Sequence, residues 1–250
     1  MTAPTDQPTL YFLGGIALRG IPKGDADALL SQSKVVALLA YLALSPRGAF
    51  QRRDRIAGLL WPELDQSHAR AALRKVVHIA RSTLGESAIV GRGDEELAFN
   101  HDAIWCDTAA LLAAVDRGHL GRAVELYADD GLMPGFYLTD CHDFDSWLSD
   151  KRAAMLESAV AASWALAQHL EANSQRTEAT KQARHTVRLA WSNERVLRRS
   201  LTMLNRLGDK VGALRQYEVF ERRLQRELEA KPSRETVDLI EAIRNGTAPA

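Results

Sequence analysis

The segment SHARAALRKVVHIARSTLG, residues 67–85, concentrates cationic side chains and contains no acidic residue. Its cations are Arg70, Arg74, Lys75 and Arg81. Guanidinium and ammonium groups bind phosphates, and a guanidinium also donates two parallel hydrogen bonds to a guanine edge. The whole chain has 32 basic and 32 acidic residues, so a nucleic-acid site has to come from a local excess of this kind.

Two other groupings have residue types that catalyse reactions elsewhere. Cys141-His142-Asp143 has the residue types of a nucleophilic site, but the sequence places no base and no oxyanion donor around the cysteine. A nearby group of acids lacks the spacing and the loop glycine of a calcium motif: Asp140, Asp143, Asp145 and Asp150. The seven histidines show no metal-binding spacing. We predict no enzyme, no catalytic residue, no metal site and no cofactor; a hydrolase using Cys141 or the acids is the weakest alternative.

A helix over residues 66–84 has to position the cations. On a helix turning by about 100° per residue, six apolar residues share one face, which we expect to be buried: Ala69, Leu73, Val76, Val77, Ala80 and Leu84. Beside this face runs a stripe formed by Arg70, Arg74, His78 and Arg81, with Lys75 further round. Arg70 and Arg74 are like charges four residues apart and disfavour the helix, which favours a nucleic acid as the source of negative charge.

The surrounding elements predict how this helix is held. TLYFLGGIALRG predicts two short strands, SQSKVVALLAYLALSPRG a helix, RRDRIAGLLWPEL a second helix, and AIVGRGDEELAF a hairpin after the third. This order is typical of a winged helix-turn-helix, whose third helix enters the major groove. We therefore assign Arg74 to a base edge with His78 beside it, and Arg70 and Lys75 to phosphates. Further backbone contacts are expected from Arg81, from Arg92 at the hairpin tip, and from the start of the second helix, where Arg52, Arg53 and Arg55 stand.

From Asp107 onward the sequence is helical and partly repeats. Leu170, Ala179 and Ala183 recur 34 residues later as Leu204, Ala213 and Tyr217, the period of tetratricopeptide helix pairs. We predict a mainly α chain with an α+β N-terminal domain over 8–106 and a tetratricopeptide-like α-helical repeat domain over 107–246; a generic helical bundle is the alternative. The middle helices carry basic residues that suggest an acidic or helical protein partner: Lys181, Arg184, Arg188 and Arg195.

Residues 10–244 resemble the SARP and AfsR-like bacterial transcriptional activators. SKVVALLAYLALSPRGAFQRRDRIAGLLWPE and ARAALRKVVHIARSTLG are similar to their OmpR/PhoB-type winged helix, and FDSWLSDKRAAMLE and GDKVGALRQYEVFERRLQRELEAKPSRETVDLIEAI to their bacterial transcriptional activator domain. The matching positions include Lys34, Arg53-Asp54, Leu60-Trp61, Arg70, Leu73 and Arg74. Glu229-Ala230 replaces the family's usual Gly-Val. The sequence contains no GxxxxGK[ST] motif for nucleotide binding, and we expect no receiver domain before the winged helix.

The resemblance implies a sequence-specific regulator of transcription, expected to be an activator. The partners that it implies are double-stranded DNA, with direct repeats as one target, and RNA polymerase or another regulatory protein. We expect a cytoplasmic protein that does not contact membranes, because the N-terminus lacks a signal peptide and the longest apolar run, 35–44, is too short to span a bilayer. The alternative is a tetratricopeptide-like adaptor whose winged helix does not bind DNA. The oligomeric state, the operator and the activating signal stay open.

Overall fold

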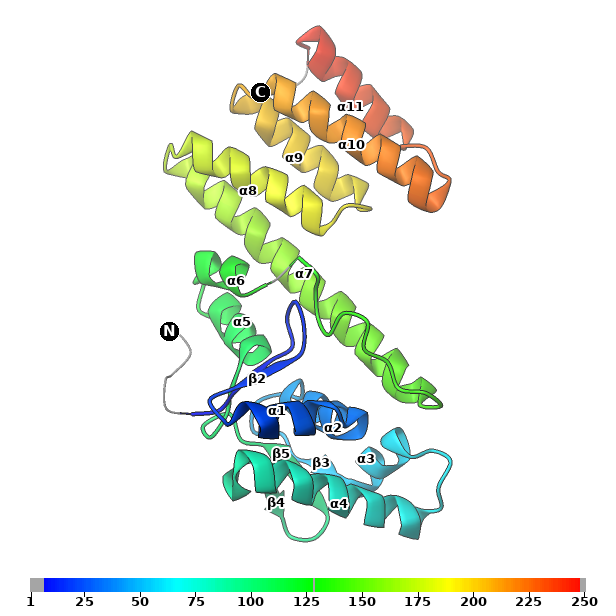
Figure 1. Cartoon of the computed structure of the whole chain (residues 1–250). Coiled ribbons are helices and arrows are strands. Elements are labelled where there is room, and N and C mark those ends of the chain that lie inside the picture. Colours follow the sequence, from blue (N-terminus) through cyan, green and yellow to red (C-terminus); the bar gives the residue numbers. More distant parts are fainter. Residues whose placement is uncertain (1–6, 128, 248–250) are drawn as a thin grey trace. The chain divides into compact units, whose positions relative to one another are not determined.

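The structure, a computed structural model, describes residues 7–127 and 129–247. It divides into two compact units, Met1–Met155 and Leu156–Ala250, which we call unit 1 and unit 2. Figure 1 shows the strands and short helices of unit 1 and the helices of unit 2. Helix α7, His142–Ala172, contributes residues to both units.

Unit 1 contains all the strands of the described residues. They are β1 Thr9–Tyr11, β2 Ala17–Arg19, β3 Gln51–Arg52, β4 Ile89–Arg92, β5 Glu96–Phe99 and β6 Trp105–Cys106. The helices that complete this unit are α1 Lys23–Leu30, α2 Ser33–Ala43, α3 Arg53–Leu60, α4 Gln66–Leu84, the short 3-10 helix η1 Glu86–Ala88, α5 Asp107–Asp116, α6 Leu120–Leu126 and the first part of α7. This order confirms the predicted winged helix-turn-helix, with α4 as its third predicted helix and the β4–β5 hairpin, which we call the wing.

Three elements of unit 1 were not predicted. Helix α1 precedes the first predicted helix, β3 pairs antiparallel with β5, and β6 pairs parallel with β1. The two resulting sheets have the strand orders β2-β1-β6 and β3-β5-β4. Strands of two residues have no periodicity to detect, so only the pairing partner reveals them.

Helix α2 forms the centre of the unit 1 core. Every residue from Val35 to Ala43 is buried, because α2 packs against α1, α3, α4 and β5. No single helix among the described residues is long and apolar enough to cross a membrane. Helices α1 and α2 together have a sufficient length and composition, but they meet at a bend of 91°.

The N-terminal sheet is completed by chain segments that follow residue 106. The backbone N–H of Gly14 donates to the Gly131 carbonyl at 2.8 Å, and that of Met133 donates to Phe12 at 2.7 Å. The Arg152 guanidinium then holds the carbonyls of Leu132 and Phe136, at 3.0 and 2.8 Å. The compact unit therefore extends past the 106/107 boundary predicted from the sequence, up to Met155.

Asp107 joins the residues that follow β1 to the start of α5 and is 2% exposed. Its carboxylate accepts hydrogen bonds from the backbone N–H groups of Phe12, Leu13 and Thr108, at 2.7–3.0 Å. Burial nevertheless raises its pKa from 3.8 to about 6, against the opposing effect of these donors.

We expect this carboxyl to make stability depend on pH. Between pH 3.8 and about 6 the folded state binds the Asp107 proton more tightly than the unfolded state, so the free energy of unfolding falls as the pH rises through that window. The contribution is about 3 kcal/mol at most and is constant above the window. Asp107→Asn should lose this slope, because the amide does not titrate.

Urea unfolding at a series of pH values, compared between the wild type and Asp107→Asn, measures the effect. The matched control is Asp116→Asn on the exposed face of the same helix, which should keep the wild-type slope. Equal slopes for the wild type and Asp107→Asn would show that Asp107 does not titrate in this window.

Unit 2 is helical throughout its described residues. After the last part of α7 come α8 Arg176–Leu189, α9 Glu194–Arg206, α10 Lys210–Leu228 and α11 Arg234–Asn245. Successive helices from α8 onward pack on one another, and five of the six predicted repeat positions are buried: Ala179, Ala183, Leu204, Ala213 and Tyr217. The sixth, Leu170, is half-buried. The 34-residue spacing was therefore a correct indicator of stacked helix pairs.

Candidate nucleic-acid interface

Helix α4 begins and ends as its sequence predicts. The Asp65 side chain caps it by accepting hydrogen bonds from the N–H groups of Ser67 and His68, at 2.9 and 3.0 Å. Gly85 ends it with a φ of 98°, a conformation that favours glycine. The buried residues of α4 are the six expected ones: Ala69, Leu73, Val76, Val77, Ala80 and Leu84.

Three of the predicted site residues lie exposed together on α4. Arg74, Lys75 and His78 are all exposed. No side-chain hydrogen bond or ion pair joins them to another of the described residues, whereas Arg47, Arg70, Arg81 and Arg92 of the same unit have such partners. Their side chains are therefore available to a ligand that approaches this face.

Arg70 differs from these three residues because the fold supplies its counter-charge. Its guanidinium donates to both carboxylate oxygens of Asp54 in α3, at 2.5 and 2.8 Å, and to Glu95 in the wing at 3.2 Å. The hydrogen bond from Arg70 holds the pKa of Asp54 below its usual range. Although α4 itself contains no acid, acids from other elements neutralise this residue, and its contact with a phosphate stays a prediction.

Arg81 and Arg92 also bind inside unit 1. The Nε of Arg81 donates to the Ile89 carbonyl at 3.0 Å and so ties α4 to the wing. Arg92 pairs with Glu96 at 2.5 Å and lies over the Phe50 ring, with 4.5 Å to the ring centroid. Arg92 is the last residue of strand β4 and directly precedes the turn at the hairpin tip.

The wing tip is acidic. The turn between β4 and β5 consists of Gly93, Asp94 and Glu95, and both carboxylate residues are exposed. Gly93 has a φ of 57°, which lets the chain reverse there. A phosphate approaching α4 from the side of the wing therefore meets negative charge. The prediction from the sequence did not take these two acids into account.

Arg52 and Arg53 lie at the junction of β3 and α3. Arg52 is exposed, and Arg53 is half-buried with its Nε buried and without a partner among the described residues. Burial lowers the pKa of Arg53, and the positive charge of Arg81 adds to the effect. Arg55, two residues further along α3, instead lines a separate hollow with Tyr41 and Trp147.

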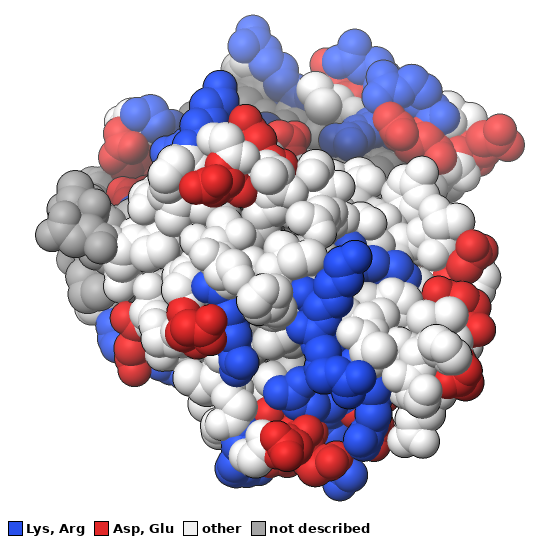
Figure 2. Space-filling view, turned by 60° about the horizontal axis from the view of Figure 1, so that its bottom comes forward, with Lys and Arg blue, Asp and Glu red and all other residues white. Residues whose placement is uncertain are grey.

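The basic residues gather around a hollow between α4 and the wing. It has a volume of about 420 Å³, and its lining residues are Arg53, Arg70, Leu73, Arg74, Val77, His78, Arg81, Glu86, Asp94 and Glu95. Figure 2 shows Lys and Arg side chains as a blue band across the face brought forward there, with acidic side chains at its lower end. The face is thus basic along α4 and acidic at the wing tip.

Cys141, from the other candidate groups, is buried in contacts within unit 1. Cys141 is 1% exposed; it accepts a hydrogen bond from the Lys34 Nζ at 2.9 Å, and its thiol donates to the Leu60 carbonyl at 3.3 Å. Lys34, which matches the family's winged-helix pattern, thus contacts Cys141 and also donates a hydrogen bond to the Leu60 carbonyl. Among the described residues no group of three or more His, Cys, Asp or Glu could hold a metal ion.

Two comparisons place the chain among known proteins. The family model described as the bacterial transcriptional activator domain matches residues 108–244, more than half of the chain. The solved structure titled Mycobacterium tuberculosis EmbR in complex with low affinity phosphopeptide is similar, with a TM-score of 0.62 and 20% identity. The match covers 98% of this chain and 66% of that one, so this chain spans just under two thirds of its length. No curated protein matches.

Proposed function

We propose that this chain, which belongs to the bacterial transcriptional activator domain family, activates transcription by binding double-stranded DNA through α4. The observation that carries this proposal is the exposed, unpaired group Arg74, Lys75 and His78 on the α4 face that does not enter the core. A helix of this kind, followed by a wing, fits the major groove.

The eight predicted residues differ in their contacts, and we assign them different roles accordingly. Arg74 is assigned to a guanine edge with His78 beside it, and Lys75 and Arg52 to phosphates, because these four are exposed and unpaired. Arg53 stands at the hollow beside α4 and adds positive charge. Arg70, Arg81 and Arg92 position α4 and the wing, since their guanidinium groups already have acceptors in unit 1.

The helical half is proposed to contact RNA polymerase or another regulatory protein. Stacked helix pairs present extended surfaces that suit protein partners. The middle helices are less basic than the sequence suggests, because Arg184 pairs with Asp209 and Lys181 with Glu178. The expectation of an acidic partner is therefore not retained. Two copies of the chain on direct repeats, acting in the bacterial cytoplasm, are consistent with this role.

A second candidate function is supported by the wing. Its tip carries Asp94 and Glu95, and Glu95 also neutralises Arg70, so the region offers less positive charge than α4 alone suggests. Acids at this position repel phosphates, but they do not interfere with an adaptor that uses its winged helix to contact proteins. The adaptor therefore remains the competing proposal.

Selection of bound sequences from a random duplex pool tests the proposed function. The full chain should enrich a defined sequence and protect it in footprinting, with an affinity that falls as salt rises because phosphate contacts release counterions. Recovery of unenriched sequences only, with no protection at any site, would favour the adaptor. A variant with Arg74 and Lys75 both replaced by alanine serves as the control and should enrich no sequence.

A further inference from the structure

A second pocket lies in unit 1, on the side formed by α5, α6 and the loop after α2. Its volume is about 350 Å³, at the small end of the range for small-molecule sites. Its apolar surface consists of the Trp105 ring, Leu126 and four alanines of α5: Ala109, Ala110, Ala113 and Ala114. Because alanine side chains are short, the pocket leaves room for a flat group against this helix.

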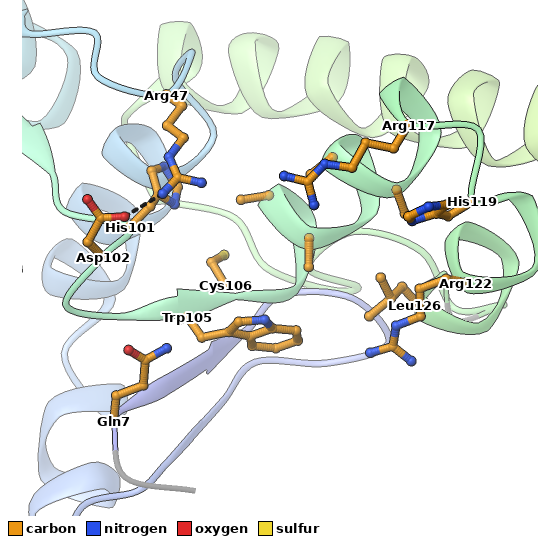
Figure 3. A pocket seen from close by; sticks show the side chains of 14 residues that line it. Gln7, Arg47, His101, Asp102, Trp105, Cys106, Arg117, His119, Arg122 and Leu126 are labelled. Carbon is orange, nitrogen blue, oxygen red and sulfur yellow. Dashed lines mark hydrogen bonds and ion pairs between the residues drawn. The ribbon is translucent and has the colours of Figure 1, made fainter. Parts of the chain in front are cut away.

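Cations from three separate segments border the same pocket. Arg47 comes from the loop after α2, Arg117 from the end of α5 and Arg122 from α6. Figure 3 shows the guanidinium groups of Arg47 and Arg117 extending towards each other across the pocket, with the Trp105 ring on the opposite wall. Such a convergence of like charges is unfavourable unless an anion compensates it.

The acids nearby compensate only part of this charge. Asp102, the one acid that lines the pocket, pairs with Arg47 at 2.5 Å, and both side chains are mostly exposed. Arg122 pairs with Glu125 in its own helix at 3.2 Å. Arg117 has no side-chain hydrogen bond or ion pair with any of the described residues, so its charge faces the pocket uncompensated.

A histidine of the pocket wall is also incompletely satisfied. His101 packs edge-on against Phe99, with ring centroids 4.8 Å apart, and its Nδ1 is buried without a partner among the described residues. Buried polar atoms normally have a hydrogen-bond partner. Because this Nδ1 is itself inaccessible, the candidate ligand site consists of the apolar floor and the converging cations.

We propose that this pocket binds a small organic anion that has a flat apolar body. The carboxylate or phosphate of such a molecule accepts hydrogen bonds from Arg117 and Arg47, and its body packs on the α5 alanines beside Trp105. The walls come from the winged-helix part and from the segment that the family model matches, so the occupant links the two inside unit 1. The site is separate from α4 and does not depend on DNA binding.

Binding of naphthalene-2-carboxylate to the full chain tests this proposal, measured by isothermal titration calorimetry. Naphthalene-2-carboxamide has the same body without the charge, and inorganic phosphate has the charge without the body. We expect saturable binding of the carboxylate at up to millimolar concentration, and binding at least about tenfold weaker for the other two probes, because charge-assisted hydrogen bonds and apolar burial both contribute.

Two variants and a control locate the site. Arg117→Gln should weaken carboxylate binding at least about tenfold by removing one charge-assisted donor. Ala113→Phe should abolish binding by filling the space over α5. Arg215→Gln removes a similarly exposed arginine from α10, far along the chain in unit 2, and should bind as the wild type does. Circular dichroism establishes that each variant is folded.

Three results would overturn the proposal. They are the absence of saturable carboxylate binding, equal binding of the carboxylate and either other probe, and unchanged binding by folded Arg117→Gln and Ala113→Phe. The first shows that the pocket takes no such anion, the second that charge or apolar surface alone acts, and the third that the molecule binds elsewhere.

Discussion

A fragment that ends at Cys106 is expected to lack a cooperative unfolding transition, whereas a fragment that ends at Met155 should unfold cooperatively. The shorter fragment loses the hydrogen bonds of Gly14 to Gly131 and of Met133 to Phe12, together with those from Phe12 and Leu13 to Asp107. Each buried hydrogen bond contributes about 1 kcal/mol, and a domain is stable by only about 5–15 kcal/mol.

Apolar contacts add to this loss. Phe144 and Leu148 at the start of α7 are fully buried, and Trp147 packs its ring on Tyr41 of α2, with centroids 4.9 Å apart. Burial of one large apolar side chain contributes about 1.5–3 kcal/mol, so the deleted residues supply stability comparable to that of the whole unit. Thermal and urea unfolding followed by circular dichroism compares the two fragments.

The full chain and the fragment 1–155 serve as folded references in that comparison. A sharp unfolding transition for the fragment 1–106, close in midpoint to that of 1–155, would show that the winged helix is stable without α5 and α7. The boundary predicted from the sequence would then also be the boundary of independent folding.

Replacing Arg74 by alanine is expected to weaken binding to the selected duplex by roughly 1–3 kcal/mol and to relax the base preference at one position. The physical reason is that an exposed, unpaired guanidinium on α4 can donate two hydrogen bonds to a guanine edge, and alanine leaves that edge without a partner. Lys75→Ala should act differently. It should weaken binding about equally on all sequences and lower the salt slope by about one unit.

Titrations at several salt concentrations, on the selected and a scrambled duplex, separate these two effects. Lys23→Ala is the matched control for Lys75→Ala, because Lys23 is an exposed lysine of the same unit on α1. If Arg74→Ala and Lys75→Ala both keep the wild-type affinity and salt slope, α4 carries only a solvated basic face. The adaptor proposal would then replace DNA binding.

The local structure of α4 was predictable because its causes lie within the helix. Periodic apolar residues from Ala69 to Leu84 define the buried face, and Gly85 ends the helix in a conformation that disfavours other residues. The exposed positions of Arg74 and His78 follow from the same periodicity. The repeat in unit 2 was equally visible, because each helix pair repeats its small packing residues at a constant spacing.

Contacts between distant segments were decided only by the tertiary structure. The sequence shows Arg70 without an acid nearby on its helix, but the fold brings Asp54 from α3 and Glu95 from the wing to its guanidinium. The same holds for Asp107, which is an ordinary acidic residue in the sequence and in the structure a buried acceptor for Phe12 and Leu13, just after β1. Periodicity along one helix records which face is buried, whereas the pairing of charges depends on where the connecting chain places other elements. For that reason the sequence by itself determined the helix and its exposed face, and the tertiary structure determined which of its cations remain free.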